Sequence, residues 1–515
     1  MPAADLVLKN ANVVTMNPKQ PGAELVAITG DRVSLVAGDE QLESVTGAKT
    51  KIIDCGGKTV VPGFNDAHCH VFSFIRKLLS LDLSPSSVSS IADIKAAISH
   101  QVQSTPPGQW LTGTGYNEFY LAEKRCPTRW DIDEVAPHHP VVLAHRSLHA
   151  CVLNSLALSL AGITRETPEP PGGIIERDLD TGEPNGILLE MLGYVWEKVV
   201  PTLSEAELAK GIALANEHYL SYGITSLQEA TVSNDLSRWQ AFHRFKDTGR
   251  LKSRVSMMLG AKALSQVQEA GLAPGSGDNQ LRLGGVKIMV TETGGQLQPS
   301  PPELDQQALE AHQAGFQLAI HAIEQNTVEA AISTLEYIHS RLPQAGRRHR
   351  IEHCSECPPQ LLERLRKLQA VVVTQPPFLY YSGERYLATV PVSQQQWLYR
   401  IKSLLDSGLV VAGSSDSPIV SDNPLVGIYV AATRRAESGQ QILPQECIPV
   451  TQALAMYTIN AAYASFEEGV KGSITQGKLA DILVLSDDPT KSPPEKVKDI
   501  QVGMTIIGGE VVWEA

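Results

Sequence analysis

Short apolar segments alternate with longer amphipathic segments along most of this chain. The apolar segments are rich in Val, Ile and Leu and are bounded by Gly or Pro, a pattern that is typical of buried strands. The amphipathic segments space their apolar residues with the period of a helix. One of them follows Ser204-x-x-Glu207, a capping box, and ends at Gly223. The eight apolar segments are residues 61–70, 224–230, 253–260, 283–290, 316–322, 350–354, 370–377 and 409–418.

Eight strands with helices between most of them predict an α/β fold, a (β/α)8 TIM-type barrel. The first two strands are separated by roughly 150 residues, which is too long for a loop, so we expect an inserted subdomain at about 73–200. Both chain ends contain short strands broken by turn signals, and neither end is long enough to close a sheet by itself. We therefore expect residues 1–60 and 470–515 to form a composite β-sandwich and residues 61–469 to form the barrel.

Composition and charge limit the classes of partner. The chain has 515 residues, of which 43% are hydrophobic and 19% charged, so it can bury a large core. A net charge of −13, with both signs scattered, argues against nucleic acid or an anionic membrane as the main partner. Neither a leader pattern nor a membrane-spanning apolar segment is visible, and the seven cysteines are scattered. We expect a cytoplasmic protein with a small-molecule substrate, and we keep a homodimer as an expectation.

Polar side chains interrupt or end several of the apolar segments. In barrels of this type the chemistry lies at the carboxyl ends of the strands. The first segment ends in His68 and His70, which point to the same side of an extended chain and can reach one shared atom. Neutral imidazoles and carboxylates suit Zn²⁺ and related ions, so these ends predict a metal site. The polar residues of the later segments are Lys287, His321, His353 and Asp416.

Two motifs make a family resemblance specific. PGFNDAHCH (residues 62–70) and GSITQGKLADILVLSDDP (residues 472–489) are similar to motifs of the amidohydrolase superfamily. The similarity is greatest to the metal-dependent hydrolases that include N-substituted formamide deformylases (amidohydrolase family 3), and it spans nearly the whole chain. It implies that a histidine pair and an aspartate bind one divalent ion, that a carboxylated lysine bridges to a second, and that two further histidines bind the second. The corresponding residues are His68, His70, Asp416, Lys287, His321 and His353.

The resemblance also implies a reaction. Two ions, most simply Zn²⁺ with Mn, Fe or Co as alternatives, would activate a water that hydrolyses a non-peptide C–N bond of an amide, formamide, imide or urea. A CO₂-derived carbamate on Lys287 would bridge them, since burial favours the neutral amine that takes up CO₂. Asp416 would be the general base. The same site would suit an ester, lactone or carbamate hydrolase, or a metal-dependent lyase or isomerase, and a non-catalytic metal-binding protein is a further alternative.

The substrate is less well defined by the sequence. Thr291-Glu292 and Glu324-Gln325 stand where many relatives have Asp-Gly and Gly-Asp, and both departures leave the expected metal ligands intact. The Gly- and Pro-rich segment 291–304 is long for a loop and is a candidate lid. Four residues are candidate substrate contacts, each with local packing or a solvated rim as its alternative interpretation. They are His149, Arg177, Tyr116 and Glu292.

Overall fold

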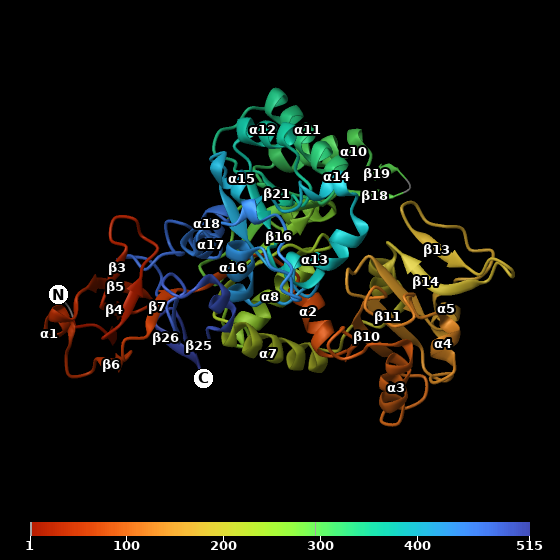
Figure 1. The fold of residues 1–515 in the computed structure, drawn as a ribbon, viewed down its shortest axis with the longest axis horizontal. Coiled ribbons are helices and arrows are strands. Elements are labelled where there is room, and N and C mark those ends of the chain that lie inside the picture. The colour runs from red at the N-terminus through yellow and green to blue at the C-terminus, as the bar shows by residue number, and fades with distance from the viewer. Residues whose placement is uncertain (1–2, 294) are drawn as a thin grey trace. The chain divides into compact units, whose positions relative to one another are not determined.

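A computed structural model describes residues 3–293 and 295–515, and its largest sheet has eight strands (Figure 1). All neighbouring strands in this sheet are parallel, in the order β23-β22-β21-β20-β17-β16-β15-β8. Each of the eight predicted apolar segments overlaps one of them, so the predicted barrel sheet is confirmed. The strands are β8 (Phe64–Cys69), β15 (Ile224–Glu229), β16 (Arg254–Gly260), β17 (Leu281–Met289), β20 (Leu318–Ala322), β21 (Arg350–His353), β22 (Val371–Thr374) and β23 (Val411–Gly413).

Helices follow most of these strands along the chain and lie outside the sheet (Figure 1). The capping box that predicted α7 is formed: Glu207 Oε2 accepts from Ser204 N at 2.8 Å and from Ser204 Oγ at 2.7 Å. Ser300 and Glu303 make the same exchange at the start of α10. The helices are α7 (Glu205–Ser221), α8 (Leu236–Asp247), α9 (Leu264–Glu269), α10 (Pro301–Gln313), α11 (Gln325–Arg341), α12 (Pro359–Leu368), α13 (Pro377–Thr389), α14 (Val392–Gln395), α15 (Ile401–Asp406), α16 (Pro424–Thr433), α17 (Val450–Met456) and α18 (Ile459–Ala464).

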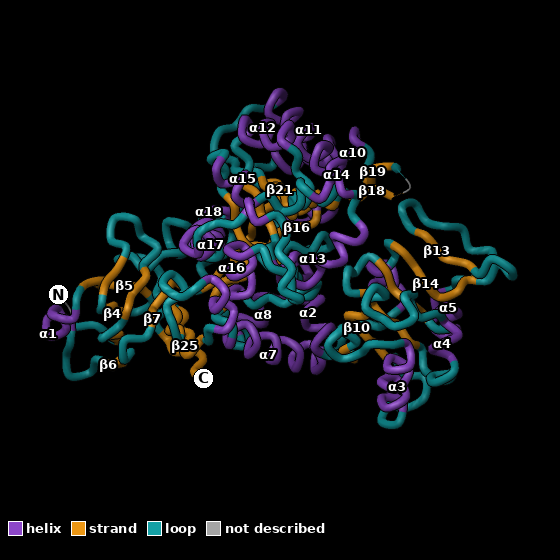
Figure 2. The backbone as a smooth tube through the Cα atoms, in the orientation of Figure 1, coloured by secondary structure: helices purple, strands orange, loops and turns teal. Residues whose placement is uncertain are grey.

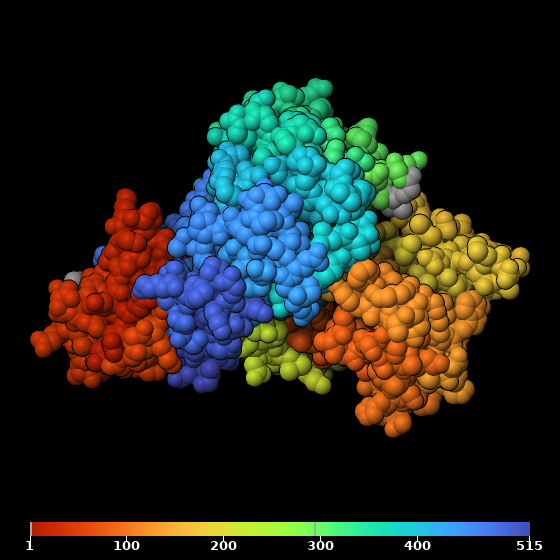
Figure 3. All heavy atoms as spheres, in the orientation of Figure 1, coloured from red at the N-terminus to blue at the C-terminus, as the bar shows by residue number. Residues whose placement is uncertain are grey.

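The two chain ends lie side by side and share strands of one sheet (Figure 3). β24 (Ile482–Leu485) pairs antiparallel with β7 (Thr59–Pro62) in a sheet of order β26-β25-β24-β7-β2-β3. A second sheet has the order β5-β4-β1-β6, and buried side chains of both sheets form one hydrophobic cluster. The remaining strands are β1 (Leu6–Lys9), β2 (Asn12–Val14), β3 (Gly22–Ala23), β4 (Leu25–Thr29), β5 (Arg32–Ala37), β6 (Lys51–Asp54), β25 (Val502–Ile507) and β26 (Glu510–Glu514), with α1 (Leu42–Val45) before β6.

Residues 71–215 form a compact unit of their own, separate from residues 1–70 and 216–515. Its six-stranded mixed sheet has the order β13-β14-β12-β11-β10-β9, and the strands are orange in Figure 2. Val141 N and Ala157 N both donate to Asn154 Oδ1, which ties a strand to a helix start. The elements are α2 (Val71–Leu78), β9 (Leu81–Asp82), α3 (Ile91–Val102), β10 (Leu111–Tyr116), α4 (Arg129–Asp133), β11 (Val141–His145), β12 (Ala150–Leu153), α5 (Ser155–Ala161), β13 (Ile174–Arg177), β14 (Pro184–Leu189) and α6 (Leu192–Tyr194).

Among the described residues, none of the helices combines the length and the apolar character that crossing a membrane requires.

Candidate metal centre

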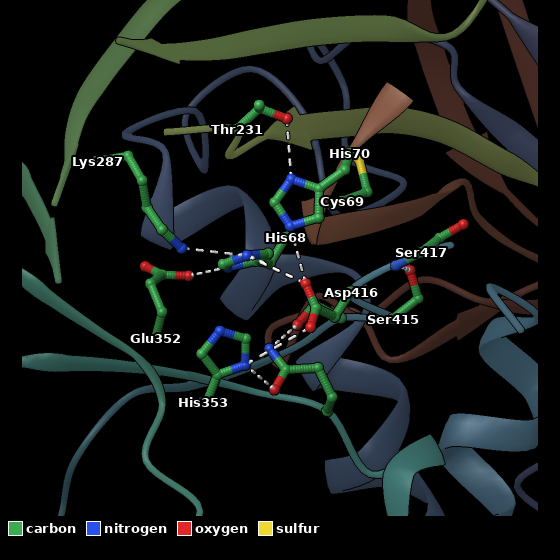
Figure 4. Close-up of polar contacts among 12 residues, drawn as sticks. His68, Cys69, His70, Thr231, Lys287, Glu352, His353, Ser415, Asp416 and Ser417 are labelled. Atoms are coloured by element: carbon green, nitrogen blue, oxygen red, sulfur yellow. Dashed lines mark hydrogen bonds and ion pairs between the residues drawn. The ribbon is translucent and has the colours of Figure 1, made fainter. Parts of the chain in front are cut away.

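His68, His70 and Asp416 bring three potential metal-binding atoms within 4.8 Å of one another. Asp416 Oδ1 lies 3.0 Å from His70 Nε2 and 3.4 Å from His68 Nε2 (Figure 4). Two backbone hydrogen bonds hold β8 against the segment after β23: Asp416 N donates to His68 O, and His70 N donates to Ser417 O, both at 2.8 Å. Asp416 has a φ of 60°. The eighth strand therefore closes on the first at the point where these side chains meet.

The hydrogen bond of His68 to Glu352 leaves its Nε2 atom as an acceptor. His68 Nδ1 lies 2.5 Å from Glu352 Oε2, and a carboxylate can only accept, so His68 Nδ1 carries the proton. Burial, and next the charge of Lys287, lower the pKa of His68 well below its usual value, so its Nε2 is an unprotonated lone pair. His70 contacts Thr231 Oγ1 through Nδ1 at 2.9 Å and Asp416 Oδ1 through Nε2 at 3.0 Å. Two imidazoles and a carboxylate whose potential ligand atoms lie this close together suit a divalent cation, and the residues present therefore fit a metal ion.

Lys287 lies next to this group inside the barrel. Its side chain is buried, and Nζ is 3.2 Å from His68 Nε2. Burial is the largest cause that lowers the pKa of Lys287, to about 8, although Glu352 and Asp416 oppose the change. A lysine with this pKa has a substantial neutral fraction near pH 8, and the neutral amine is the form that reacts with CO₂.

The two remaining candidate ligands, His321 and His353, pack against each other with ring centroids 4.5 Å apart. His353 Nδ1 donates to Gln375 Oε1 at 2.8 Å and lies 4.0 Å from Asp416 Oδ2. Its ring centroid is 4.9 Å from that of His68. Both histidines are buried, and burial lowers the pKa of His353. The structure thus brings all six candidate ligands together at the carboxyl ends of the barrel strands.

Asp416 stays ionised in spite of its burial. Burial raises the pKa of this carboxyl, but the imidazoles of His353, His70 and His68 outweigh it, and the net pKa is below the usual value. An ionised carboxylate beside a candidate metal site can bind a cation and can also accept a proton.

Sequence reasoning missed Glu352, which is completely buried beside His68. Arg350 donates to Glu352 Oε1 from Nε at 2.5 Å and to Oε2 from Nη2 at 2.9 Å. Glu352 thereby holds His68 with Nε2 toward Lys287 and Asp416, and it also raises the basicity of that nitrogen. The only signal in the sequence was the Arg350-x-Glu352 spacing, which places two charges on one side of a buried strand.

We expect Glu352→Gln to weaken metal binding by about 10- to 100-fold, because His68 loses the charged acceptor that orients it. Competition with a chromophoric chelator measures the affinity. Glu363→Gln is the matched control, since Glu363 is paired with Arg366 on α12 and lies on the protein surface. Equal metal affinity of the two variants would show that Glu352 does not orient His68.

The four candidate substrate contacts are divided between the two units, and their role stays a prediction. Tyr116, His149 and Arg177 belong to the unit 71–215, whereas Glu292 belongs to the unit that contains the candidate ligands. Tyr116 is completely buried, and burial raises its pKa well above the usual value. His149 Nδ1 lies 2.9 Å from Glu190 Oε1, and Arg177 Nη2 donates to Thr167 O at 2.6 Å. Glu292 is exposed and accepts from Asn326 Nδ2 at 3.0 Å.

The candidate lid begins with a two-stranded hairpin, β18 (Thr291–Thr293) and β19 (Gln296–Gln298), within which residue 294 lies outside the described residues. α10 starts at Pro301, inside the predicted segment. Closure of this segment over a substrate stays a prediction.

Comparison with known proteins places the chain among metal-dependent hydrolases. The model of the amidohydrolase family matches residues 51–513. An N-substituted formamide deformylase of Arthrobacter pascens is 30% identical over 99% of this chain and 98% of its own length. The crystal structure of an uncharacterized metal-dependent hydrolase from Pyrococcus furiosus is 26% identical with a TM-score of 0.73, covering 94% of this chain and 100% of that one. A second such hydrolase, from Pyrococcus horikoshii, shares the fold with a TM-score of 0.76 at 23% identity, covering 95% and 99%.

Proposed function

The chain belongs to the amidohydrolase family, and on this premise we propose that it is a metal-dependent hydrolase that cleaves a non-peptide carbon–nitrogen bond of a small molecule. The bond class, an amide, formamide, imide or urea, is supported by the similarity to a formamide deformylase along nearly the whole chain. The observation that carries the proposal is the closeness of potential ligand atoms of His68, His70 and Asp416, which lie within 4.8 Å of one another.

His68, His70 and Asp416 would hold one divalent ion, and Lys287 as a carbamate, with His321 and His353, would hold a second. Zinc is the simplest assignment for both ions, although manganese, iron or cobalt also suit these ligands. When bound, divalent ions of this kind lower the pKa of a water molecule and polarise a carbonyl group. The burial of all six side chains except His70 supports the proposal, because a dry site strengthens these electrostatic effects.

Asp416 would move the proton in this reaction. Its ionised carboxylate accepts a proton from the attacking water as the water oxygen bonds to the carbonyl carbon. It then delivers that proton to the leaving nitrogen while the C–N bond breaks, so the products are an amine and a carboxylic acid, which keeps the second proton of the water until it ionises in solution. Glu352 and Thr231 keep the imidazoles of His68 and His70 oriented throughout, through contacts of 2.5 and 2.9 Å.

A substrate panel tests the reaction class directly. We expect turnover of at least one N-formyl, N-acyl, imide or urea compound, with one ¹⁸O atom from labelled water in the acid product. Mass spectrometry measures the label. Turnover of esters or lactones alone would show that the enzyme cleaves acyl–oxygen bonds instead of carbon–nitrogen bonds. Turnover without the label would show that the enzyme is a lyase or an isomerase.

We also propose the domain organisation expected from the sequence, with residues 1–60 and 470–515 as a composite β-sandwich and residues 61–469 as the barrel. The hydrophobic cluster common to the two terminal sheets supports the first part. An inserted subdomain at about 73–200 is supported by the compact unit 71–215.

A further inference from the structure

A cavity of about 370 Å³ lies at the opposite end of the barrel strands from the candidate metal centre. Arg282 and Gly284 line it from the start of β17, whereas Lys287 lies near the end of that strand. Gln317 lines it immediately before β20, and Arg350 is the first residue of β21. These residues lie at or before the starts of their strands, although Gln228 and Met258 line the cavity from further along β15 and β16, and none of the six candidate metal ligands lines it.

The charges around this cavity have one sign. Its lining includes three arginines, Arg282, Arg347 and Arg350, and no Asp, Glu, Lys or His among the described residues. Arg350 is neutralised, because Glu352 accepts two of its hydrogen bonds while Gln228 and Ala67 accept the others. The guanidinium of Arg350 therefore bonds to groups of the barrel core. The positive charge that no described carboxylate pairs with is that of Arg282 and Arg347.

Arg282 and Arg347 form no ion pair with any carboxylate of the residues that the structure describes. Within the described parts of the chain, neither guanidinium has an Asp or Glu oxygen within 4.0 Å. Arg347 Nε donates to Gln344 Oε1 at 2.5 Å, and Nη1 donates to Gly315 O, so both of its bonds are to neutral acceptors. Two guanidiniums at one cavity without a counter-charge favour an anionic occupant.

Glycines allow the two guanidiniums to lie close to the cavity wall. Gly275 has a φ of +80°, and a Cβ atom added there would lie 3.0 Å from Arg282 Nη2. Gly315 has a φ of +90°, and a Cβ atom added there would lie 3.7 Å from Arg347 Nη1 and from Pro274 Cγ. Gly315, which faces Arg347, is therefore also next to Pro274, and Pro274 directly precedes Gly275, which faces Arg282. Met258, Leu283 and Phe466 add an apolar part to the lining.

From this geometry we propose that the cavity binds a small organic or inorganic oxyanion, a carboxylate or a phosphate, through Arg282 and Arg347. Each guanidinium offers parallel N–H donors that match two oxygens of such a group. The apolar lining leaves room for a short hydrocarbon part of a carboxylate. The ligand is not the hydrolysed substrate, because no candidate ligand or base lines this cavity. This inference does not depend on the proposed hydrolysis.

Isothermal titration calorimetry of the metal-loaded protein tests the site, with inorganic phosphate and sodium butyrate as separate probes in an amine buffer of low ionic strength that contains no oxyanion. Ala345 lines the cavity and is exposed, so it can be replaced without disturbing the core. Ala345→Glu and Ala345→Gln differ only in charge. Arg282→Gln removes one donor group, and Arg250→Gln changes an exposed arginine that does not line the cavity.

We expect one of the two probes to bind with a Kd below about 10 mM, and the tighter probe identifies the class of anion. Arg282→Gln and Ala345→Glu should each weaken binding by about tenfold or more, whereas Ala345→Gln and Arg250→Gln should retain it. Binding of neither probe would overturn the proposal. Binding that is equal in Ala345→Glu and Ala345→Gln would also overturn it, since the anion would then be bound elsewhere, for instance at the metal ions.

Discussion

Asp416→Asn is expected to lower turnover by about three orders of magnitude while the protein stays folded. The amide has nearly the shape of the carboxylate, so the two backbone hydrogen bonds between β8 and the segment after β23 can form as before. It cannot accept a proton, however, and the proton of the attacking water then has no acceptor at the position that Asp416 occupies. Steady-state kinetics on the substrate found by the panel, with metal analysis of the same sample, measures the effect.

Asp422→Asn is the matched control for this variant. Asp422 is also buried, lies six residues further along the same connection and pairs with His218 at 2.7 Å, but it is not one of the candidate ligands. We expect its loss to affect stability more than turnover. If Asp416→Asn retained metal and stayed within about tenfold of the unmodified enzyme, Asp416 would not be the general base.

Lys287→Ala is expected to lower turnover by about two orders of magnitude or more, because the proposed link between the two ions is removed. Short carboxylic acids, such as acetate and propionate, should restore part of the activity by placing a carboxylate in the space of the missing side chain. The physical basis is the position of Nζ, which is buried and 3.2 Å from His68 Nε2. Activity as a function of added acetate is the measurement.

Lys246→Ala is the control that separates the proposed bridging role of Lys287 from the general effect of losing a buried lysine. Burial lowers the pKa of Lys246 to about 7, and its ammonium group bonds to Ser253 O rather than to a candidate ligand. Acetate should therefore not restore any activity that Lys246→Ala loses. Full activity of Lys287→Ala without added acid would favour a site with a single ion.

The candidate metal centre could be predicted largely from the sequence because each of its polar residues lies in or at the end of an apolar segment. His321 and His353, for example, are the fourth residues of β20 and β21, so the strand pattern alone places them at one end of the barrel. Glu352 could not be assigned in this way. Its partner His68 is 284 residues away, and a Glu two residues after Arg350 suggests a local ion pair.

The boundaries of elements were less predictable. The segment 370–377 was expected to be extended throughout, but β22 ends at Thr374 and Pro377 is the first residue of α13. The first residue of a helix does not need the backbone N–H that proline lacks. Proline can therefore open a helix as easily as it can end a strand. The substrate contacts stay a prediction, and three of the four candidates, Tyr116, His149 and Arg177, lie in the unit 71–215 outside the strands of the barrel.

Metal content measured together with activity tests the central claim most directly. The claim is that His68, His70, Asp416, Lys287, His321 and His353 hold divalent ions on which hydrolysis depends. Emission spectroscopy of the purified protein should find about two equivalents of a divalent metal; chelation should abolish turnover, and added Zn²⁺ or Mn²⁺ should restore it. A metal-free preparation with full activity would contradict the account.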